Sequence, residues 1–158
     1  MYERMFSDWA SWESRNNSLG DEPGVYAIAK SNRNISGKPF SWCEEIIYIG
    51  MTNAPYGLKG RLRHFDATIS GKATNHGGSD RVRYAHQNYE LLSPQLYVAV
   101  AAFKCDVLSN KPQDLITMGK VAEFEFRCFA QFAKQFDRLP EFNDKKRSKK
   151  FSNQNSGL

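Results

Sequence analysis

Two tyrosines, an arginine and a glutamate in this sequence could act together on a phosphate ester. Tyr26 and Tyr48 each lie in a short β-rich stretch, while Arg61 and Glu125 lie in later stretches of helical periodicity. A phenol can exchange a proton, a guanidinium matches phosphate oxygens with its planar fork, and a carboxylate can hold a divalent metal. The alternative is that both tyrosines are ordinary strand aromatics that fill a core, but two phenols on neighbouring strands, followed by an arginine and a buried glutamate, are more polar than a core requires.

Arg61 lies at the border of an apolar helical stripe. Leucine, phenylalanine and isoleucine recur at helical spacing from Leu58 to Ile69, and at about 100° per residue Arg61 falls beside that stripe whereas Arg63 does not. From this border a guanidinium can reach the surface of a neighbouring sheet. A salt bridge to a nearby carboxylate is the alternative, and we favour phosphate because no acidic partner lies among its helical neighbours.

Glu125 falls on the apolar face of a long helix predicted over residues 115–136. Glu123 falls on the opposite, charged face of the same helix. A carboxylate on a buried face is costly unless it is paired or holds a metal, so Glu125 requires an explanation and Glu123 does not. An inert ion pair with Arg61 is the structural alternative to a metal ligand.

The order of these residues resembles that of the GIY-YIG nuclease superfamily. The resemblance rests on Gly24-Val25-Tyr26, on Tyr48-Ile49-Gly50, on the Arg-x-x-His that ends at His64, on a later helical glutamate and on the Pro-x-x-Asn that ends at Asn143. It covers about residues 23–143. It implies hydrolysis of DNA phosphodiester bonds with one Mg²⁺ or Mn²⁺, for which Glu125 is the protein ligand.

The resemblance also implies a role for each matched side chain. Arg61 would bind the phosphate, and one tyrosine of the pair, with a slight preference for Tyr26, would receive the proton of the attacking water. Asn143 would support the site, although it could equally be a surface turn residue. The further candidates for proton shuttling or phosphate contact are Lys59, His64 and His76, and His76 could be a loop histidine without a role.

The positive charge is concentrated in two places. The chain carries a formal charge of +5, and its basic residues cluster in residues 59–83 and in a lysine-rich tail after residue 144. Such patches attract a polyanion through phosphate contacts and counterion release. The tail alone could serve only solubility. The predicted DNA-binding residues are Lys59, Arg63, His76, Arg81 and Arg83, and a nucleic-acid-binding module that does not cut is the alternative function.

The patterns predict an α+β fold in which a small, mainly antiparallel sheet of three strands is flanked by helices. The strands are expected at 24–30, 45–50 and 95–104, and further helices at 58–71 and 81–89. Aromatic residues at helical spacing predict an additional N-terminal helix. The expected organisation is a helical extension over 1–22, a nuclease-like domain over 23–144 and a basic tail over 145–158.

Composition excludes several classes of protein. The longest apolar stretch, residues 96–103, is far shorter than the roughly 20 residues of a membrane-spanning helix. The N-terminus lacks the apolar core of a secretory signal. Three cysteines without a Cys-x-x-Cys pair favour a reducing cytoplasm over a disulfide framework or a structural zinc site. Cutting both DNA strands would require two active sites or two visits, so a homodimer is an open expectation.

Overall fold

The core of the protein is an open, antiparallel sheet of four strands in the order β1-β4-β2-β3. The computed structural model describes residues 5–17, 19–73, 77–146 and 149. β2 pairs along its length with both β3 and β4, and it is buried almost throughout because both of its faces are covered. The strands are β1 (Ala10–Ser11), β2 (Gly24–Lys30), β3 (Ile46–Thr52) and β4 (Leu96–Ala102).

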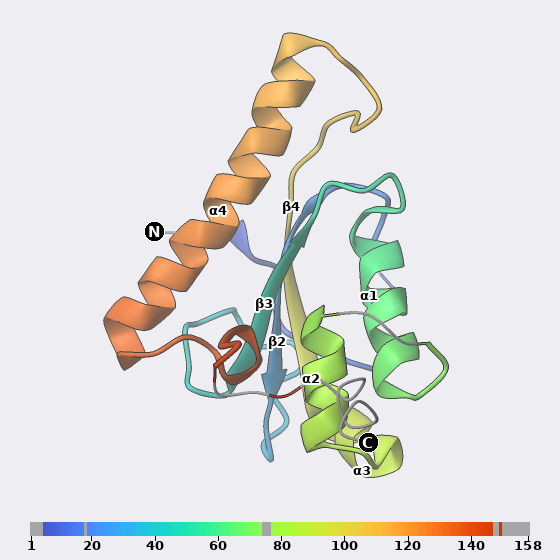
Figure 1. Ribbon diagram of the computed structural model, residues 1–158, viewed down its shortest axis with the longest axis vertical. Helices are drawn as coiled ribbons and strands as arrows, with labels where there is room; N and C mark the ends of the chain where they lie inside the picture. Colours follow the sequence, from blue (N-terminus) through green and yellow to red (C-terminus); the bar gives the residue numbers. More distant parts are fainter. Residues whose placement is uncertain (1–4, 18, 74–76, 147–148, 150–158) are drawn as a thin grey trace.

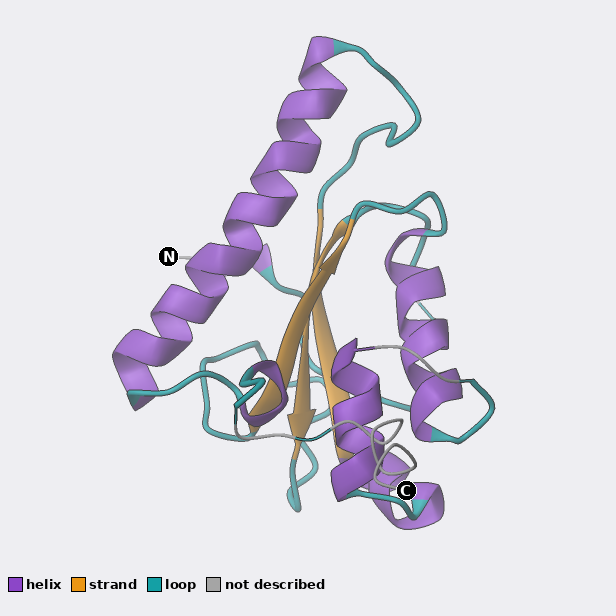
Figure 2. Ribbon diagram, viewed as in Figure 1, coloured by secondary structure: helices purple, strands orange, loops and turns teal. Residues whose placement is uncertain are grey.

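Helices cover both faces of this sheet (Figure 1). The long helix α4 packs on one face, and α1 with α2 packs on the other (Figure 2). The predicted α+β class is therefore confirmed. The helices are α1 (Gly57–Ile69), α2 (Gly77–Ala85), α3 (Tyr89–Leu92) and α4 (Pro112–Phe136), with 3₁₀ turns at Ser93–Gln95 and Glu141–Asn143.

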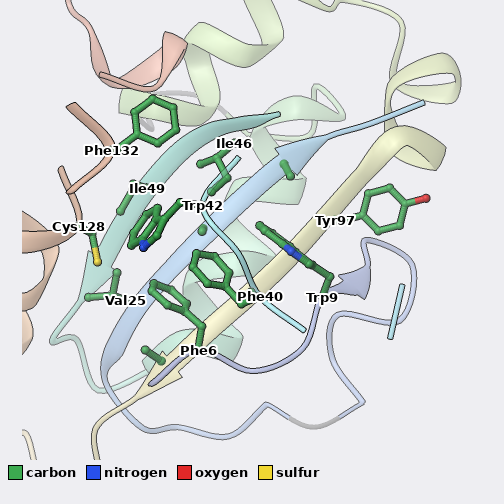
Figure 3. Close-up of a cluster of buried hydrophobic side chains, with 14 of the residues drawn as sticks. Phe6, Trp9, Val25, Phe40, Trp42, Ile46, Ile49, Tyr97, Cys128 and Phe132 are labelled. Carbon is green, nitrogen blue, oxygen red and sulfur yellow. The ribbon is translucent and has the colours of Figure 1, made fainter. Parts of the chain in front are cut away.

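Two separate hydrophobic clusters hold these layers together. Beneath α4, small residues of β2 and β4 meet Val121 and Phe132, and an aromatic group that includes Phe6 and Trp42 closes the cluster (Figure 3). On the other face, Leu62 of α1 packs with apolar residues of β2, β4 and α2. Because the strands alternate their side chains between the faces, consecutive residues of β2 supply different clusters.

The prediction of an N-terminal helix is wrong for the residues that the structure describes. Residues 5–17 contain no α-helix, and Ala10–Ser11 form β1, which adds a fourth strand beside β4. Trp9 lies in the cluster beneath α4, whereas Trp12 lies in the cluster on the other face. The helical spacing of these aromatics was misleading because they bury on opposite sides of the sheet, which one helical face cannot do.

The segment before residue 23 is built into the same body as the sheet. The backbone N–H groups of Leu58 and Lys59 donate to the carbonyls of Glu22 and Gly20, at 2.9 and 3.3 Å, which satisfies two donors at the start of α1. Asp66 of α1 accepts from Trp12 Nε1 at 2.8 Å. The N-terminal segment therefore fixes α1 in place.

The element boundaries differ from the predictions by a few residues. α2 begins at Gly77 rather than at residue 81, and α4 begins at Pro112, where proline suits the first turn because it has no N–H to satisfy. Among the described residues, no helix combines the length and apolar character that a bilayer crossing requires.

Trp12 should be one of the most sensitive positions for stability. Trp12 is 1% exposed and bonded to Asp66, so Trp12→Ala should lower the free energy of unfolding by about 3–5 kcal/mol through the cavity it leaves. Phe126 is 71% exposed on α4, and Phe126→Ala should change stability by less than about 0.5 kcal/mol. Urea denaturation of both variants measures the difference, and equal losses would contradict the packing described.

Candidate active site

The hydroxyl of Tyr26 lies inside the protein, against the backbone of the neighbouring strand. Tyr26 is fully buried in β2 and stands opposite Gly50 of β3 in the strand register. A Cβ atom on Gly50 would lie 2.5 Å from the Tyr26 hydroxyl oxygen, which is closer than such atoms can approach. Gly50 of the Tyr48-Ile49-Gly50 motif therefore leaves the space that the phenol of Tyr26, in the Gly24-Val25-Tyr26 motif, occupies.

Arg61 of α1 binds this buried hydroxyl. Its Nε donates a hydrogen bond to the Tyr26 hydroxyl oxygen at 3.4 Å, and its side chain is half-buried. No ion pair joins Arg61 to any residue that the structure describes. Its two Nη atoms are not among the described polar atoms that are buried without a hydrogen-bond partner. The guanidinium thus has free donors for an anion, and the alternative of a structural salt bridge finds no described partner.

Tyr48 of β3 stands beside Tyr26. Their ring centroids are 6.0 Å apart, with the planes inclined at 45°, and Tyr48 is half-buried. Burial raises the pKa of the Tyr26 hydroxyl well above its ordinary value, and Tyr48 raises it further, while Arg61 opposes both effects. Burial also raises the pKa of Tyr48, again opposed by Arg61. Of the two tyrosines, Tyr26 is fully buried, whereas Tyr48 keeps part of its surface exposed.

Glu125 approaches from the opposite layer of the fold. It lies on the face of α4 that also carries the buried residues Val121 and Cys128, yet its own side chain is only half-buried. Burial raises the pKa of Glu125 to about 7, against the opposing pull of Arg61. Its charge also raises the pKa values of Tyr26 and Tyr48. The four side chains therefore form one electrostatic unit drawn from both layers.

The predicted alternative for Glu125, an ion pair with Arg61, is not formed. Within the described part of the chain, the Glu125 carboxylate has no ion pair and no hydrogen bond, although Arg61 is close enough to affect its pKa. Glu123, as expected from its polar face, pairs with Arg127 on the helix surface at 2.9 Å. Glu125 is thus a half-buried carboxylate that none of the described side chains neutralises.

Asn143 holds the outer edge of β3. Its side-chain oxygen accepts from the Ile49 N–H and its side-chain amide donates to the Ile49 carbonyl, both at 2.8 Å. Ile49 lies between Tyr48 and Gly50, so the two bonds from Asn143 fix the part of β3 that carries Tyr48 and Gly50. Asn143 therefore braces β3 through both backbone groups of Ile49, rather than being a turn residue without such contacts.

The remaining predicted residues are distributed around the site. Lys59, Arg63 and His64 are exposed on α1, where the His64 ring lies 4.8 Å from that of Tyr56. Arg83 is half-buried and Arg81 is buried, so Arg81 does not extend into solvent as a DNA contact would. His76 lies outside the described residues. The structure therefore brings Tyr26, Tyr48 and Arg61 together, places Glu125 within electrostatic reach of them, and leaves His64 on the outer surface.

Gly78 is a part of the site that sequence reasoning missed. A Cβ atom on Gly78 would lie 2.2 Å from Cε2 and 2.7 Å from the hydroxyl oxygen of Tyr48, so the first turn of α2 packs directly on this ring. Two consecutive glycines such as Gly77-Gly78 are typical of a loop, whereas here they begin α2. A contact between residues 30 positions apart leaves no trace in local periodicity, although a second glycine beside the first was a signal of close approach.

A divalent metal fits this site only with a single protein ligand. The described residues contain no group of three or more histidine, cysteine, aspartate or glutamate side chains that could enclose an ion. Mg²⁺, however, commonly keeps several waters and takes one or two carboxylates together with substrate phosphate oxygens. The half-buried carboxylate of Glu125, which no described residue neutralises, meets that requirement.

Comparisons with models of known protein families, with curated proteins and with solved structures found no match for this chain. Its function must therefore be inferred from the residues and their geometry. The four side chains, together with Gly50 of β3 and Gly78 of α2, carry that inference.

Glu125 should destabilise the metal-free protein when it ionises. Its pKa of about 7 lies above the ordinary value of 4.5, so the stability that its protonated form contributes is present below about pH 4.5 and is lost as the pH rises through about 7. Glu125→Gln should therefore be more stable than the parent at about pH 8, by on the order of 1–3 kcal/mol. The two proteins should be equally stable at about pH 4.

Denaturant unfolding with a chelator present, at both pH values, measures this difference. Glu123→Gln is the matched control, because Glu123 lies on the exposed face of the same helix. An equal stability of Glu125→Gln and the parent at the higher pH would show that Glu125 is better solvated than the structure indicates.

Removal of the Asn143 amide should loosen β3 at one point. Asn143→Ala leaves the N–H and carbonyl of Ile49 without these partners and should cost about 1–3 kcal/mol. Hydrogen exchange of the Ile49 amide, followed by NMR, should become faster. Asn143→Asp retains an acceptor for that N–H and should protect it partially, whereas unchanged exchange in both variants would rule out the bracing role.

Proposed function

We propose that this protein is a metal-dependent endonuclease of the GIY-YIG type, which hydrolyses phosphodiester bonds in DNA. The observation that carries the proposal is the Arg61 guanidinium, which is bound through Nε to the buried Tyr26 hydroxyl and keeps its Nη donors free beside Tyr48. A preorganised guanidinium of this kind stabilises the charge that builds on a phosphate in the transition state.

The two tyrosines take different roles in this proposal. Tyr26 is sealed from solvent, so its hydroxyl serves to hold Arg61 in place. Tyr48 is only partly buried beside the same guanidinium and is the better candidate to take a proton from the attacking water, after its own phenol proton has passed to solvent with the help of the Arg61 charge. This choice differs from the preference for Tyr26 that the sequence alone suggested, because a proton acceptor must be within reach of water.

Glu125 would hold the single Mg²⁺ or Mn²⁺. When bound, the metal supplies a Lewis acid that stabilises the leaving oxygen. The raised pKa of Glu125, about 7, means that metal binding must displace a proton from part of the population at neutral pH. Metal affinity should accordingly weaken as the pH falls below about 7.

The exposed basic residues provide a surface for the DNA backbone. Lys59 and Arg63 project from α1, the helix that carries Arg61, and Lys145 and Lys146 are exposed where the lysine-rich tail begins. Contacts of this kind position a duplex without reading its sequence.

The three cysteines are free, which agrees with action in a reducing cytoplasm.

A cleavage assay with matched variants tests the proposal. The protein is incubated with supercoiled plasmid and short duplexes in Mg²⁺, Mn²⁺ or chelator. Cleavage should require metal and be abolished in Glu125→Gln but kept in Glu123→Gln, which differs by two positions on the same helix. Arg61→Lys should slow cleavage by roughly 10²–10³-fold, and Tyr48→Phe by roughly 10²–10⁴-fold.

The same assay separates the enzyme from a binding module. DNA binding by the parent and by Glu125→Gln, without cleavage by either in any metal, would leave only a protein that holds nucleic acid. If the plasmid is cut in both strands, sedimentation with and without DNA establishes whether the proposed enzyme acts as a homodimer.

A further inference from the structure

The first turn of α2 packs directly against the side chain of Tyr48. Gly78 faces the ring edge and the hydroxyl of Tyr48, and any side chain there would collide with them. The beginning of α2 is therefore fixed by the ring of a residue in the proposed site.

This turn carries a buried guanidinium. Arg81 lies one turn after Gly77, is 9% exposed and donates from Nη1 to the Gly77 carbonyl at 3.2 Å. Its Nε is buried without a hydrogen-bond partner, and it forms no ion pair with any residue the structure describes. A buried charge that lacks a counterion is costly, so it is expected to serve a purpose.

Arg81 acts electrostatically on Tyr48. The groups that influence the pKa of Tyr48 come from four elements: Tyr26 from β2, Arg61 from α1, Glu125 from α4 and Arg81 from α2. Arg61 and Arg81 lower the pKa of Tyr48, and Glu125 raises it. A phosphate bound to Arg61 would offset the positive charge of Arg61. The positive charge of the buried Arg81 would then remain to stabilise the Tyr48 phenolate.

We propose that Arg81 is a positioning residue for Tyr48, which orients the phenol through the first turn of α2 and stabilises negative charge on its oxygen. The inference rests on the proposed nuclease function, in which Tyr48 takes a proton. It differs from the role that the sequence suggested, because a side chain that is 9% exposed does not reach a DNA backbone on the surface.

Three variants test this role. Arg81→Gln removes the charge, Arg81→Lys keeps a charge without the planar fork, and Lys104→Gln removes a charge from an exposed site after β4 as the control. Arg81→Gln should lower the rate of bound-substrate cleavage by about 100-fold, as expected for a misplaced reacting group, and leave the Kd for DNA unchanged. Arg81→Lys should restore part of the rate, and Lys104→Gln should behave as the parent.

A second readout does not depend on cleavage. Difluorotyrosine is incorporated, the Tyr48 signal is assigned by its absence in Tyr48→Phe, and its titration is followed by fluorine NMR in chelator. In Arg81→Gln the midpoint should move to higher pH, because a positive charge beside the phenolate has been lost. If Arg81→Gln does not fold, Arg81→Met supplies the same neutral test with an apolar side chain of similar length.

The outcomes separate the two proposals. An unchanged Tyr48 titration in a folded neutral variant overturns the role of Arg81, and so does a loss of DNA affinity that accounts for the whole loss of rate. A shifted titration in a protein that cuts no DNA supports the coupling of Arg81 to Tyr48 while the nuclease proposal fails.

Discussion

The arrangement of this molecule depends on a phenol hydroxyl placed inside a β-sheet protein, where it must find a partner. Tyr26 projects from the central strand, and Arg61 supplies the partner from α1. A buried hydroxyl without a hydrogen bond would be costly, so this bond draws a guanidinium inward that would otherwise extend into solvent. It also explains why the strand opposite must carry a glycine at position 50.

Burial and charge are in conflict throughout this region, and the conflict is consistent with a functional site. Burial opposes ionisation of both tyrosines and of Glu125, while Arg61 favours ionisation of all three and Arg81 favours that of Tyr48. A protein selected only for stability would replace Glu125 by an apolar residue of α4, as its neighbours Val121 and Cys128 illustrate. Perturbed groups that converge from several elements are typical of sites where protons or ions are exchanged.

Local patterns in the sequence predicted the elements but not their contacts. The β-rich runs gave β2 and β3 within a few residues, and the stripe from Leu58 to Ile69 gave α1 and the inward edge on which Arg61 lies. The prediction of an N-terminal helix was wrong because the spacing of the aromatic residues reflects their burial on the two faces of the sheet. The packing of Gly78 on Tyr48 and the burial of Arg81 are tertiary contacts, which periodicity does not encode.

The role of Asn143 also could not be decided from the sequence, since the same Pro-x-x-Asn suits an exposed turn. Its bonds to Ile49 have a consequence beyond the site. The free border of a sheet is a template on which other chains can polymerise, and proteins interrupt such borders with short or irregular partners. Here a single amide interrupts one border and the two-residue β1 covers the other, so the site can lie open at β3 without inviting aggregation.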